Sequence, residues 1–573
     1  MYDVETNTRD ANCYYQEPSV VRHALNEHTL LQIINNDACV AGLVAGNEWS
    51  GSWGVLGHDC VERVGGAIAN NRYLQSLYIG NDIYDRSRNI RSLVPLFRGL
   101  ARNRSITHLR LSSLDLSQAD TISIITTLFF HNDNLRFISI YGCTLPHDVS
   151  PIMLAMSKCN KLKRIELRMN DSRNCPMAFD TLRHFRSLLE LRLEGSFGKI
   201  NFENLVQSVS KIVYLQLERC DIDNESVVTL IDSFVENKTV KKFEIITSNH
   251  KRIAGSGWRT FAAYLRNPYC TLEELTICDE YVDDENEPNN GLDDQEAVGL
   301  AEALATNSTI TKLNMSTFSG VTAEGWITFF NTLLHSQCSL EELDLSGNVI
   351  DDEGALVLIN LLATFRNLRI LHLNDNCITS NGLRGITRLL QPNSKLRELS
   401  IHDMKVDDND CFNDEVFIEF VDVLSNNTSL YIFMFDDCEV TDQIWTALSR
   451  ILCDKKTIES IYYSNHTLNN IGSIDISKTV YHSDIKSLLC LNENQDKTAV
   501  IRQKILTHYF PSDMNSIEVF AGMSTSFMSR AIEWIGKDTF GFTLMYNVTR
   551  GSPSLFESKI SSSDMGKKRK LFP

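Results

Sequence analysis

A chain of 573 residues, 43% hydrophobic and 22% charged, is too long for one ordinary globular core, so it must hold several domains or grow by repetition. No run of about 18 apolar residues is present, and the acidic start (residues 1–5) differs from a signal peptide, which argues against a membrane-spanning or secreted chain. The 15 cysteines are odd in number and form no Cys-x-x-Cys pair, so we expect reduced thiols in a cytoplasmic protein.

The net charge of −18 is unevenly distributed. Residues 271–442 hold 33 Asp and Glu against 8 Lys and Arg, whereas the rest of the chain is net positive. Such asymmetry bears on partners rather than on fold. Because a strongly acidic segment repels phosphates, we expect no nucleic-acid partner.

The N-terminal segment 1–39 starts polar and then shows helical patterns around residues 20–25 and 30–34. Terminal units of a repeat stack differ from the inner ones because they cover an open end of the core. We therefore predict an N-terminal helical cap over 1–39.

A repeated pattern follows. Leu340, Leu343, Leu345 and Asn348 stand in an LxxLxLxxN arrangement that recurs 28 residues later from Leu368. Apolar residues three and five positions after each start predict 15 repeats over 40–467, with starts at Val40, Leu74, Ile106, Leu135, Leu162, Leu188, Ile212, Val240, Leu272, Ile310, Leu340, Leu368, Leu396, Leu430 and Ile458.

Each repeat predicts one strand and one helix. The Leu-x-Leu alternation is typical of a short strand, and residues 355, 358, 359 and 362 then follow helical spacing. Parallel strands are spaced more closely than helices, so the stack should curve. We predict an α/β solenoid, a horseshoe with a concave parallel sheet and convex helices.

Asparagine marks the junctions of the repeats. It precedes many strands, and because it tolerates left-handed backbone we interpret it as a helix stop. The sites are Asn71, Asn103, Asn134, Asn237, Asn307, Asn367, Asn393 and Asn426. At the eighth position after a start, Asn or compact Cys should satisfy loop backbone groups, as at Cys143, Asn170, Cys220, Asn348, Asn376 and Cys438.

These repeats resemble the ribonuclease-inhibitor-like class of leucine-rich repeats over about residues 40–467. The resemblance implies the horseshoe fold and leaves the function open. It departs from the class at Glu280, Phe318 and Met404, which stand at the Asn position, and in two long inserts around 283–294 and 407–410. We interpret the inserts as solvated acidic loops; cation binding is the alternative, although EF-hand spacing is absent.

Beyond the repeats, we predict a helical C-terminal cap over 468–557 and a disordered basic tail over 558–573. Lys567, Lys568, Arg569 and Lys570 resemble a nuclear import signal, so nuclear localisation is the alternative to a cytoplasmic one.

Motifs for catalysis or cofactors are not found. Gly51, Gly54 and Gly57 lack the GxGxxG spacing of a phosphate loop, and the chain has no GK[ST], HExxH or GxSxG motif. His372 and His402 occupy matching strand positions, but a paired surface histidine alone does not make a metal site. We therefore predict no enzyme activity, no cofactor and no metal.

The concave face is the predicted partner-binding surface. Strand positions two, four and six after each start should face it, because positions three and five enter the core. The face should change from aromatic and basic to acidic along the chain, and aromatic and Arg residues are frequent anchors at interfaces. The predicted site is Tyr78, Arg110, Phe137, Tyr141, Arg164, Arg168, Arg192, Tyr214, Glu274, Asp279, Glu342, Asp344, Asp375, Glu398, Asp403, Asp436 and Asp437.

Two functional hypotheses follow. The first is a non-enzymatic scaffold whose concave face binds a protein partner with a basic surface. The second rests on resemblance to repeat-containing GTPase-activating proteins that act on a nuclear-transport GTPase, although the acidic tail typical of that family is missing. Single-turnover GTP hydrolysis would distinguish them.

Overall fold

The structure is a computed structural model, and it describes residues 22–45, 60–80, 93–146, 148–168, 181, 184–195, 211–220, 222–247, 253–279, 292–318, 320–334, 336, 338–365, 367–391, 394–402, 414–435, 441–472 and 482–509. The predicted elements at 51–57, 283–291, 407–410 and 510–573 lie outside these residues, as do Asp403, Asp436 and Asp437.

Fifteen parallel strands form one sheet whose strand order follows the chain. They are β1 Arg22–Ala24, β2 Gly42–Ala45, β3 Ser76–Gly80, β4 His108–Ser112, β5 Phe137–Tyr141, β6 Arg164–Arg168, β7 Glu190–Glu194, β8 Tyr214–Glu218, β9 Lys242–Thr247, β10 Glu274–Asp279, β11 Lys312–Asn314, β12 Glu342–Asp344, β13 Ile370–His372, β14 Glu398–Ser400 and β15 Ile432–Met434.

The helices alternate with the strands along the chain. They are α1 Glu27–Ile34, α2 Cys60–Asn70, α3 Val94–Arg102, α4 Ala119–His131, α5 Ser150–Met156, α7 Asn224–Asn237, α8 Gly255–Leu265, α9 Asp294–Thr306, α10 Ala323–Leu333, α11 Asp352–Leu362, α12 Ser380–Ile386, η4 Thr387–Leu390, α13 Asp414–Leu424, α14 Asp442–Leu452, α15 Ile458–Tyr462, α16 His482–Asn492 and α17 Lys497–Tyr509.

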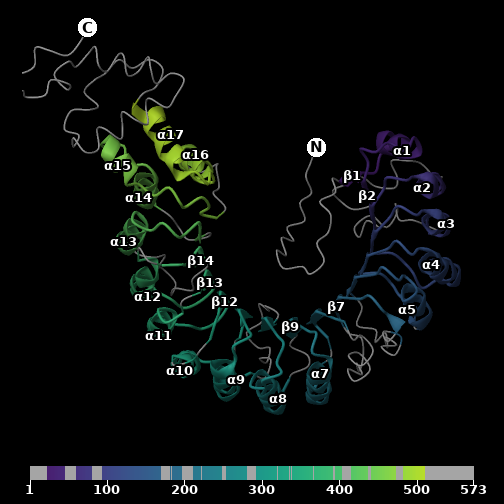
Figure 1. The fold of residues 1–573 in the computed structure, drawn as a ribbon, viewed down its shortest axis with the longest axis horizontal. Coiled ribbons are helices and arrows are strands. Elements are labelled where there is room, and N and C mark those ends of the chain that lie inside the picture. Colours follow the sequence, from purple (N-terminus) through teal and green to yellow (C-terminus); the bar gives the residue numbers. More distant parts are fainter. Residues whose placement is uncertain are drawn as a thin grey trace, which may run out of the picture. The chain divides into compact units, whose positions relative to one another are not determined.

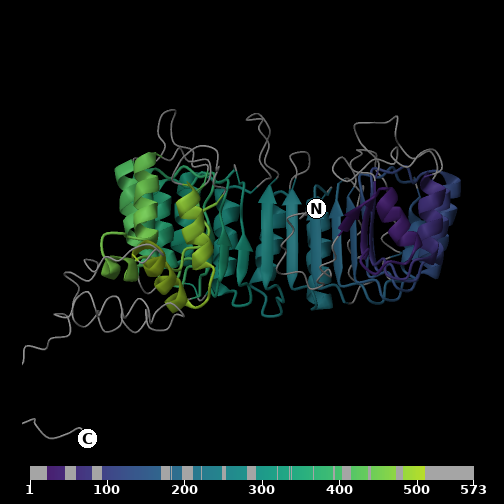
Figure 2. The same cartoon turned by 90° about the horizontal axis from the view of Figure 1, so that it is seen from above.

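The chain divides into two compact units, Met1–Val349 and Ile350–Pro573. In the first unit the helices cover one face of the sheet, and the strands lie side by side in front of them (Figures 1 and 2). Strand positions three and five are buried beneath the helices, as Leu77 and Ile79 show in β3. Large helix side chains such as Phe97, Phe129 and Trp326 fill the space between the layers.

The second unit repeats this plan. Leu371 in β13 and Leu399 in β14 are fully buried, and Leu358 and Ile359 of α11 lie in the same core. The predicted α/β solenoid is therefore confirmed in both units. Every predicted start from Val40 to Leu430 stands two residues before a strand, so the predicted register is also confirmed.

Two elements differ from the prediction. The helical pattern at 20–25 contains a strand, β1, because residues 22–24 pair with β2 from Arg22↔Gly42 to Ala24↔Val44. The helix α1 follows it, capped by Asn26, whose Oδ1 accepts from the Thr29 N–H at 2.8 Å.

The last predicted repeat start, Ile458, is also wrong. It begins the short helix α15, which a capping box of Thr457 and Ser460 starts. The strand-like contact of this repeat comes later, where Asn470 bridges to Ile432 in β15. The repeat pattern therefore continues beyond Ile458, past an inserted helical turn.

Among the described residues, none of the predicted junction asparagines has left-handed backbone, and Asn393 lies outside the described residues. Asn103 and Asn307 have extended backbone, with φ of −69° and −83°. Their buried amides instead link neighbouring repeats: Asn103 Nδ2 donates to Ile68 O at 2.7 Å and to Asn71 O at 2.8 Å, while its Oδ1 accepts from the Ile106 N–H at 2.9 Å. The same arrangement recurs three residues before the first apolar residue of several repeats, and we call these residues the asparagine ladder: Asn71, Asn103, Asn307, Asn427 and Asn465.

Two asparagines at the eighth position, Asn348 and Asn376, behave as predicted, while Asn170 and Cys438 lie outside the described residues. Asn348 Nδ2 donates to Leu345 O at 2.8 Å and to Met315 O at 2.9 Å, and its Oδ1 accepts from the Phe318 N–H at 2.9 Å. In the second unit, Asn376 Nδ2 donates to Leu373 O at 2.9 Å. These buried amides close the turns that follow the strands.

Candidate functional site

The strand face that the helices leave uncovered carries positions two, four and six of each repeat, and we call it the open face. The alternation of β7 shows the two sides: Leu191 and Leu193 are buried, while Arg192 and Glu194 are half-buried on the other side. Because the strands pair in register, each open-face residue stands beside its counterpart in the next strand.

Aromatic rings and guanidinium groups stack along the first half of this face. The guanidinium carbons of Arg110 and Arg164 lie 5.0 and 5.2 Å from the centre of the Phe137 ring. Arg168 stands over Tyr141 at 4.5 Å. Such contacts stabilise by about 0.5–1 kcal/mol when exposed and more when desolvated.

Tyr214 continues the stack. Arg192 and Lys242, from the strands on either side, lie 4.7 and 4.5 Å from its ring centre. Tyr214 is 1% exposed and Phe137 is 0% exposed. These two predicted anchors therefore organise their neighbours and offer little surface to a partner.

Carboxylates neutralise the arginines within the face. Arg164 pairs with Glu166, and its Nε lies 3.6 Å from Oε2 of the fully buried Glu190. Glu166 also lies 3.7 Å from Arg192. Buried charges need such partners, because an unpaired one would be strongly destabilising.

The edge of the same region carries a further pair. Arg168 Nε lies 2.5 Å from Oε1 of Glu194, and Arg219 Nη1 lies 3.5 Å from the same oxygen. At position two, four or six of β4 to β7 there are four arginines and three glutamates. The predicted basic region is thus nearly neutral.

The pattern shifts from β8 to β12. Lys242 Nζ lies 3.0 Å from Glu244 and 3.6 Å from Glu274, while Lys312 Nζ lies 3.6 Å from Glu274 and 2.9 Å from Glu342. Burial, opposed by the two lysines, raises the pKa of the Glu274 carboxyl.

Carboxylates outnumber cations in this second part, which we call the acidic region. Two lysines, Lys242 and Lys312, stand against five acids, and the acids are Glu218, Glu244, Glu274, Glu342 and Asp344. Burial, followed by the charges of Glu244, Glu218 and Asp344, raises the pKa of the Cys278 thiol to about 12. That thiol is accordingly a poor nucleophile.

Asp279 does not belong to the open face. It is 7% exposed, and its Oδ1 accepts a hydrogen bond from Thr247 Oγ1 at 3.2 Å. Its carboxylate joins the ends of β9 and β10, so its role is structural.

In the second unit the open face is more mixed. His372 Nε2 lies 3.0 Å from Glu398 Oε1 across β13 and β14, while Ile370, Ile432 and Met434 are half-buried apolar neighbours. The neighbouring Asp375 is half-buried with left-handed backbone, φ +53°.

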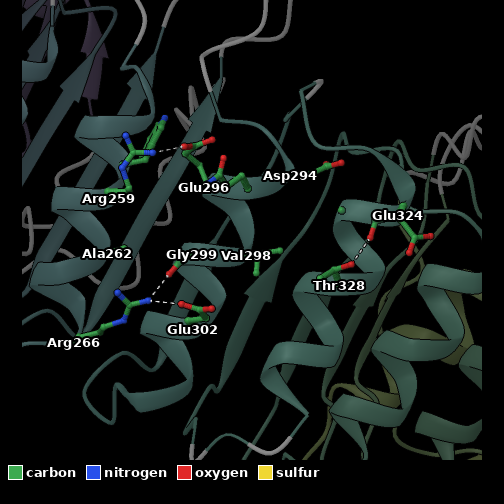
Figure 3. A pocket seen from close by; sticks show the side chains of 13 residues that line it. Arg259, Ala262, Arg266, Asp294, Glu296, Val298, Gly299, Glu302, Glu324 and Thr328 are labelled. Carbon is green, nitrogen blue, oxygen red and sulfur yellow. Dashed lines mark hydrogen bonds and ion pairs between the residues drawn. The ribbon is translucent and has the colours of Figure 1, made fainter.

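A groove of about 570 Å³ lies on the helix side, along α8, α9 and α10 (Figure 3). Arg259 Nη1 lies 3.1 Å from Glu296 Oε1, and Arg266 Nη2 lies 2.8 Å from Glu302 Oε2. Asp294 Oδ1 accepts a hydrogen bond from the Thr322 N–H at 2.7 Å, and Thr322 is the N-cap residue of the next helix, α10. These groups join adjacent helices, so we assign the groove a structural role.

Within the described residues, no group of three or more His, Cys, Asp or Glu side chains could hold a metal ion. Among the described helices, none combines the length and apolar character needed to cross a membrane.

Comparison with known proteins supports the repeat assignment. A family model described as a leucine-rich repeat matches residues 336–358 and 366–386. The ribonuclease inhibitor of Sus scrofa is 24% identical over 327 residues, which cover 53% of this chain and 70% of the inhibitor. The chain is a leucine-rich repeat protein of the ribonuclease-inhibitor-like class.

Other relatives of this leucine-rich repeat protein are longer. "NACHT, LRR and PYD domains-containing protein 14" of Mus musculus is 24% identical over 362 residues, so the match spans 62% of this chain but 34% of that protein. One chain in the crystal structure of the yeast Rad7 and Elc1 complex is 18% identical in sequence to this chain. The match covers 60% of this chain and 78% of the chain in that structure, with a TM-score of 0.38. A likeness that low carries no inference.

The sequence pattern missed part of the network. Lys312, Glu218 and Glu244 stand at positions two, six and four of their repeats, so strict use of the register would have found them. The pairing between strands has no local sequence signal.

Proposed function

We propose that this leucine-rich repeat protein is a non-enzymatic interaction protein that holds a protein partner on its open face, with the acidic region meeting a basic partner surface. The observation that carries the proposal is the excess of carboxylates over β8 to β12, where two lysines face five acids. Complementary charge accelerates association and sets the orientation of a complex.

The ordering of the open face supports binding. Its arginines and lysines are held by rings and carboxylates of the same and neighbouring strands, so their side chains are fixed before a partner arrives. Side chains ordered in advance lose less entropy on association. Arg and Tyr are also residue types that often dominate interface energetics.

A binding role fits the chemistry of the described thiols. Burial raises the pKa of Cys143 and Cys159 to about 12, as it does for Cys278, so these groups stay protonated at neutral pH. The Sus scrofa relative is named for inhibiting an enzyme, which supports a protein partner over a small substrate.

Site-specific photocrosslinking tests the face directly. A photoreactive amino acid replaces Thr276, which is half-buried on β10, or Thr328, which lies on α10. We expect a partner crosslinked at Thr276 and not at Thr328, and a crosslink from Thr328 alone would place binding on the helix side instead.

Charge reversal tests the acidic region. Glu342→Lys with Asp344→Lys should abolish capture of the crosslinked partner and remove its sensitivity to salt. Glu302→Lys with Glu324→Lys makes the same change of charge on the helix side and should leave capture intact. Equal capture by both double variants would refute the proposal, provided that circular dichroism shows both to be folded.

A further inference from the structure

A buried lysine fastens the last described helix of the second unit. Lys504, on α17, is 2% exposed. Its Nζ donates to Leu452 O at 2.7 Å and to Asn465 O at 3.2 Å, and it lies 3.2 Å from His466 Nδ1. All three acceptors are uncharged, which is an unusual environment for an ammonium group.

The contacts of Lys504 extend the asparagine ladder. Asn465 Nδ2 donates to Leu424 O, the last residue of α13, and to Asn427 O, the preceding rung. Lys504 makes the corresponding pair of bonds one repeat later, to the last residue of α14 and to Asn465 O. Asn492, from α16, reaches Asn465 O at 3.4 Å and Leu468 O at 2.6 Å, so the carbonyl of Leu452 depends on the lysine.

His466 completes the arrangement. Its Nε2 lies 3.3 Å from Tyr462 O, so this nitrogen carries the hydrogen, and Nδ1 is left to accept from the ammonium. Burial, and then the charge of Lys504, lowers the pKa of His466 to about 3. A proton on Nδ1 would replace the hydrogen bond with two facing cations.

Other titratable groups surround this contact. Cys453 of the α14 cap faces Lys504, and so does Lys497 of α17, which donates to Asn492 O at 2.7 Å. Lys455 and Asp454 lie in the loop after α14, and Tyr509 of α17 donates to Lys455 O at 2.9 Å. Lys497, like Lys504, disfavours a positive charge on His466 and so lowers its pKa.

We propose that α17 is a detachable cover over the last described repeat of the second unit, held by the Lys504–His466 contact and released when acidification protonates His466. Figure 1 shows α17 beside α15 and α16, the elements against which it packs. Releasing it would uncover the carbonyls of Leu452 and of Asn465, the last described rung of the asparagine ladder.

The two titrations act in the same direction. His466 has a folded pKa of about 3 against about 6.5 when released, so opening becomes easier as the pH falls below 6.5. Burial lowers the pKa of Lys504 to about 7, so the closed cover tightens as the pH rises from 7 towards the ordinary lysine value. The cover is therefore closed most firmly in alkali and most loosely in acid.

Hydrogen exchange of the full chain, read by mass spectrometry on peptides from α17 and from α13, tests the cover. After correction for intrinsic rates, the titration of His466 alone should raise the opening equilibrium of α17 about 30-fold between pH 7.5 and pH 5.0, while α13 stays protected. His466→Asn should leave only the roughly fourfold change that the titration of Lys504 supplies over the same range.

A second variant tests the titration of Lys504 above pH 7. Lys504→Met should abolish the roughly 20-fold tightening expected between pH 7.5 and pH 9.0, whereas Lys486→Met, at an exposed site on α16, should retain it. If α17 and α13 open together at each pH, or if His466→Asn keeps the full pH dependence, the proposal is wrong. The His466→Asn measurement decides between these outcomes even if Lys504→Met fails to fold.

Discussion

Removing one rung of the asparagine ladder should destabilise the first unit strongly. Asn103 is 1% exposed and joins three segments of backbone. Its Nδ2 donates to Ile68 O and Asn71 O, and its Oδ1 accepts from the Ser105 N–H at 2.8 Å and the Ile106 N–H at 2.9 Å. Asn103→Ala removes these four hydrogen bonds between buried or part-buried groups, and also the contact from Ser105 Oγ to Asn103 Oδ1 at 3.1 Å.

The expected cost follows from these four bonds. Each is worth about 1 kcal/mol net, and a buried group left without a partner costs about 1–3 kcal/mol. Asn71 O keeps a second bond, from Ser105 Oγ at 3.2 Å, so its loss is smaller. We therefore expect Asn103→Ala to lower the free energy of unfolding by about 3–4 kcal/mol.

Two further variants define the assay, which is urea unfolding followed by circular dichroism. Asn134→Ala is the control, because Asn134 is half-exposed and its side chain makes only exposed bonds: its Nδ2 donates to Arg104 O at 2.7 Å, and its Oδ1 accepts from Lys161 Nζ at 2.9 Å. Its cost should stay below about 1 kcal/mol. Asn103→Asp keeps the acceptor but points a carboxylate at two carbonyls.

Burial should raise the pKa of an aspartate at position 103, so the folded state binds its proton more tightly than the unfolded state. The deficit of Asn103→Asp should then shrink as the pH falls, whereas that of Asn103→Ala should not. Equal costs for Asn103→Ala and Asn134→Ala would refute the view that the ladder holds the repeats together.

Three other outcomes follow from the packing. Leu343→Ala should cost about 2–5 kcal/mol in urea unfolding, because Leu343 is 4% exposed in the core; a negligible cost would contradict the register. Gly325→Ala should be destabilising by about 1–3 kcal/mol, since its Cβ would lie 1.9 Å from Asp294 Oδ1. Gly299→Ala has open space around the added Cβ and should stabilise the helix by up to about 1 kcal/mol. Equal shifts of the melting temperature in the two variants would contradict this difference. The lowered pKa of His466 means that the unfolded state binds more protons below pH 6.5, so the second unit should lose stability as the pH falls from 6.5. A free energy of unfolding in urea that stays constant below pH 6.5 would exclude this contribution of His466.

The periodic part of the fold could be predicted because its cause is local. Residues such as Leu77 and Ile79 alternate with polar neighbours, and that alternation fixes both the strand and the side that faces the helices. The strand β1 could not be predicted in this way, because three residues become a strand through pairing with β2. Ile458 fits the sequence pattern of a repeat start but begins a helix. The next repeat starts instead at Leu468, where Asn465 stands three residues earlier as a rung of the asparagine ladder.

The residue types on the open face could be predicted from the sequence, but their burial and their ion pairs could not. Position two of the repeats predicts Phe137, Arg164 and Tyr214 on the open face, yet all three are buried there. Their burial comes from neighbours in adjacent strands, 24 to 29 residues away in sequence, and no local pattern encodes that pairing. Most of the predicted charges on the open face are therefore paired with an opposite charge. Over β8 to β12, acids outnumber these cationic partners, so the excess charge there is negative.

The asparagine ladder also explains why pH sensitivity should concentrate at one end of the second unit. Inside the stack, each rung is an amide, which donates and accepts without a change of charge at any pH that the fold survives. At the last described rung, Lys504 takes over the donor role towards Leu452 O and Asn465 O, and His466 accepts from the same ammonium. Both groups titrate, and burial moves both towards their neutral forms. The contact at Lys504 therefore depends on protons, whereas the asparagine rungs do not, so acid should loosen α17 before it loosens the interior repeats.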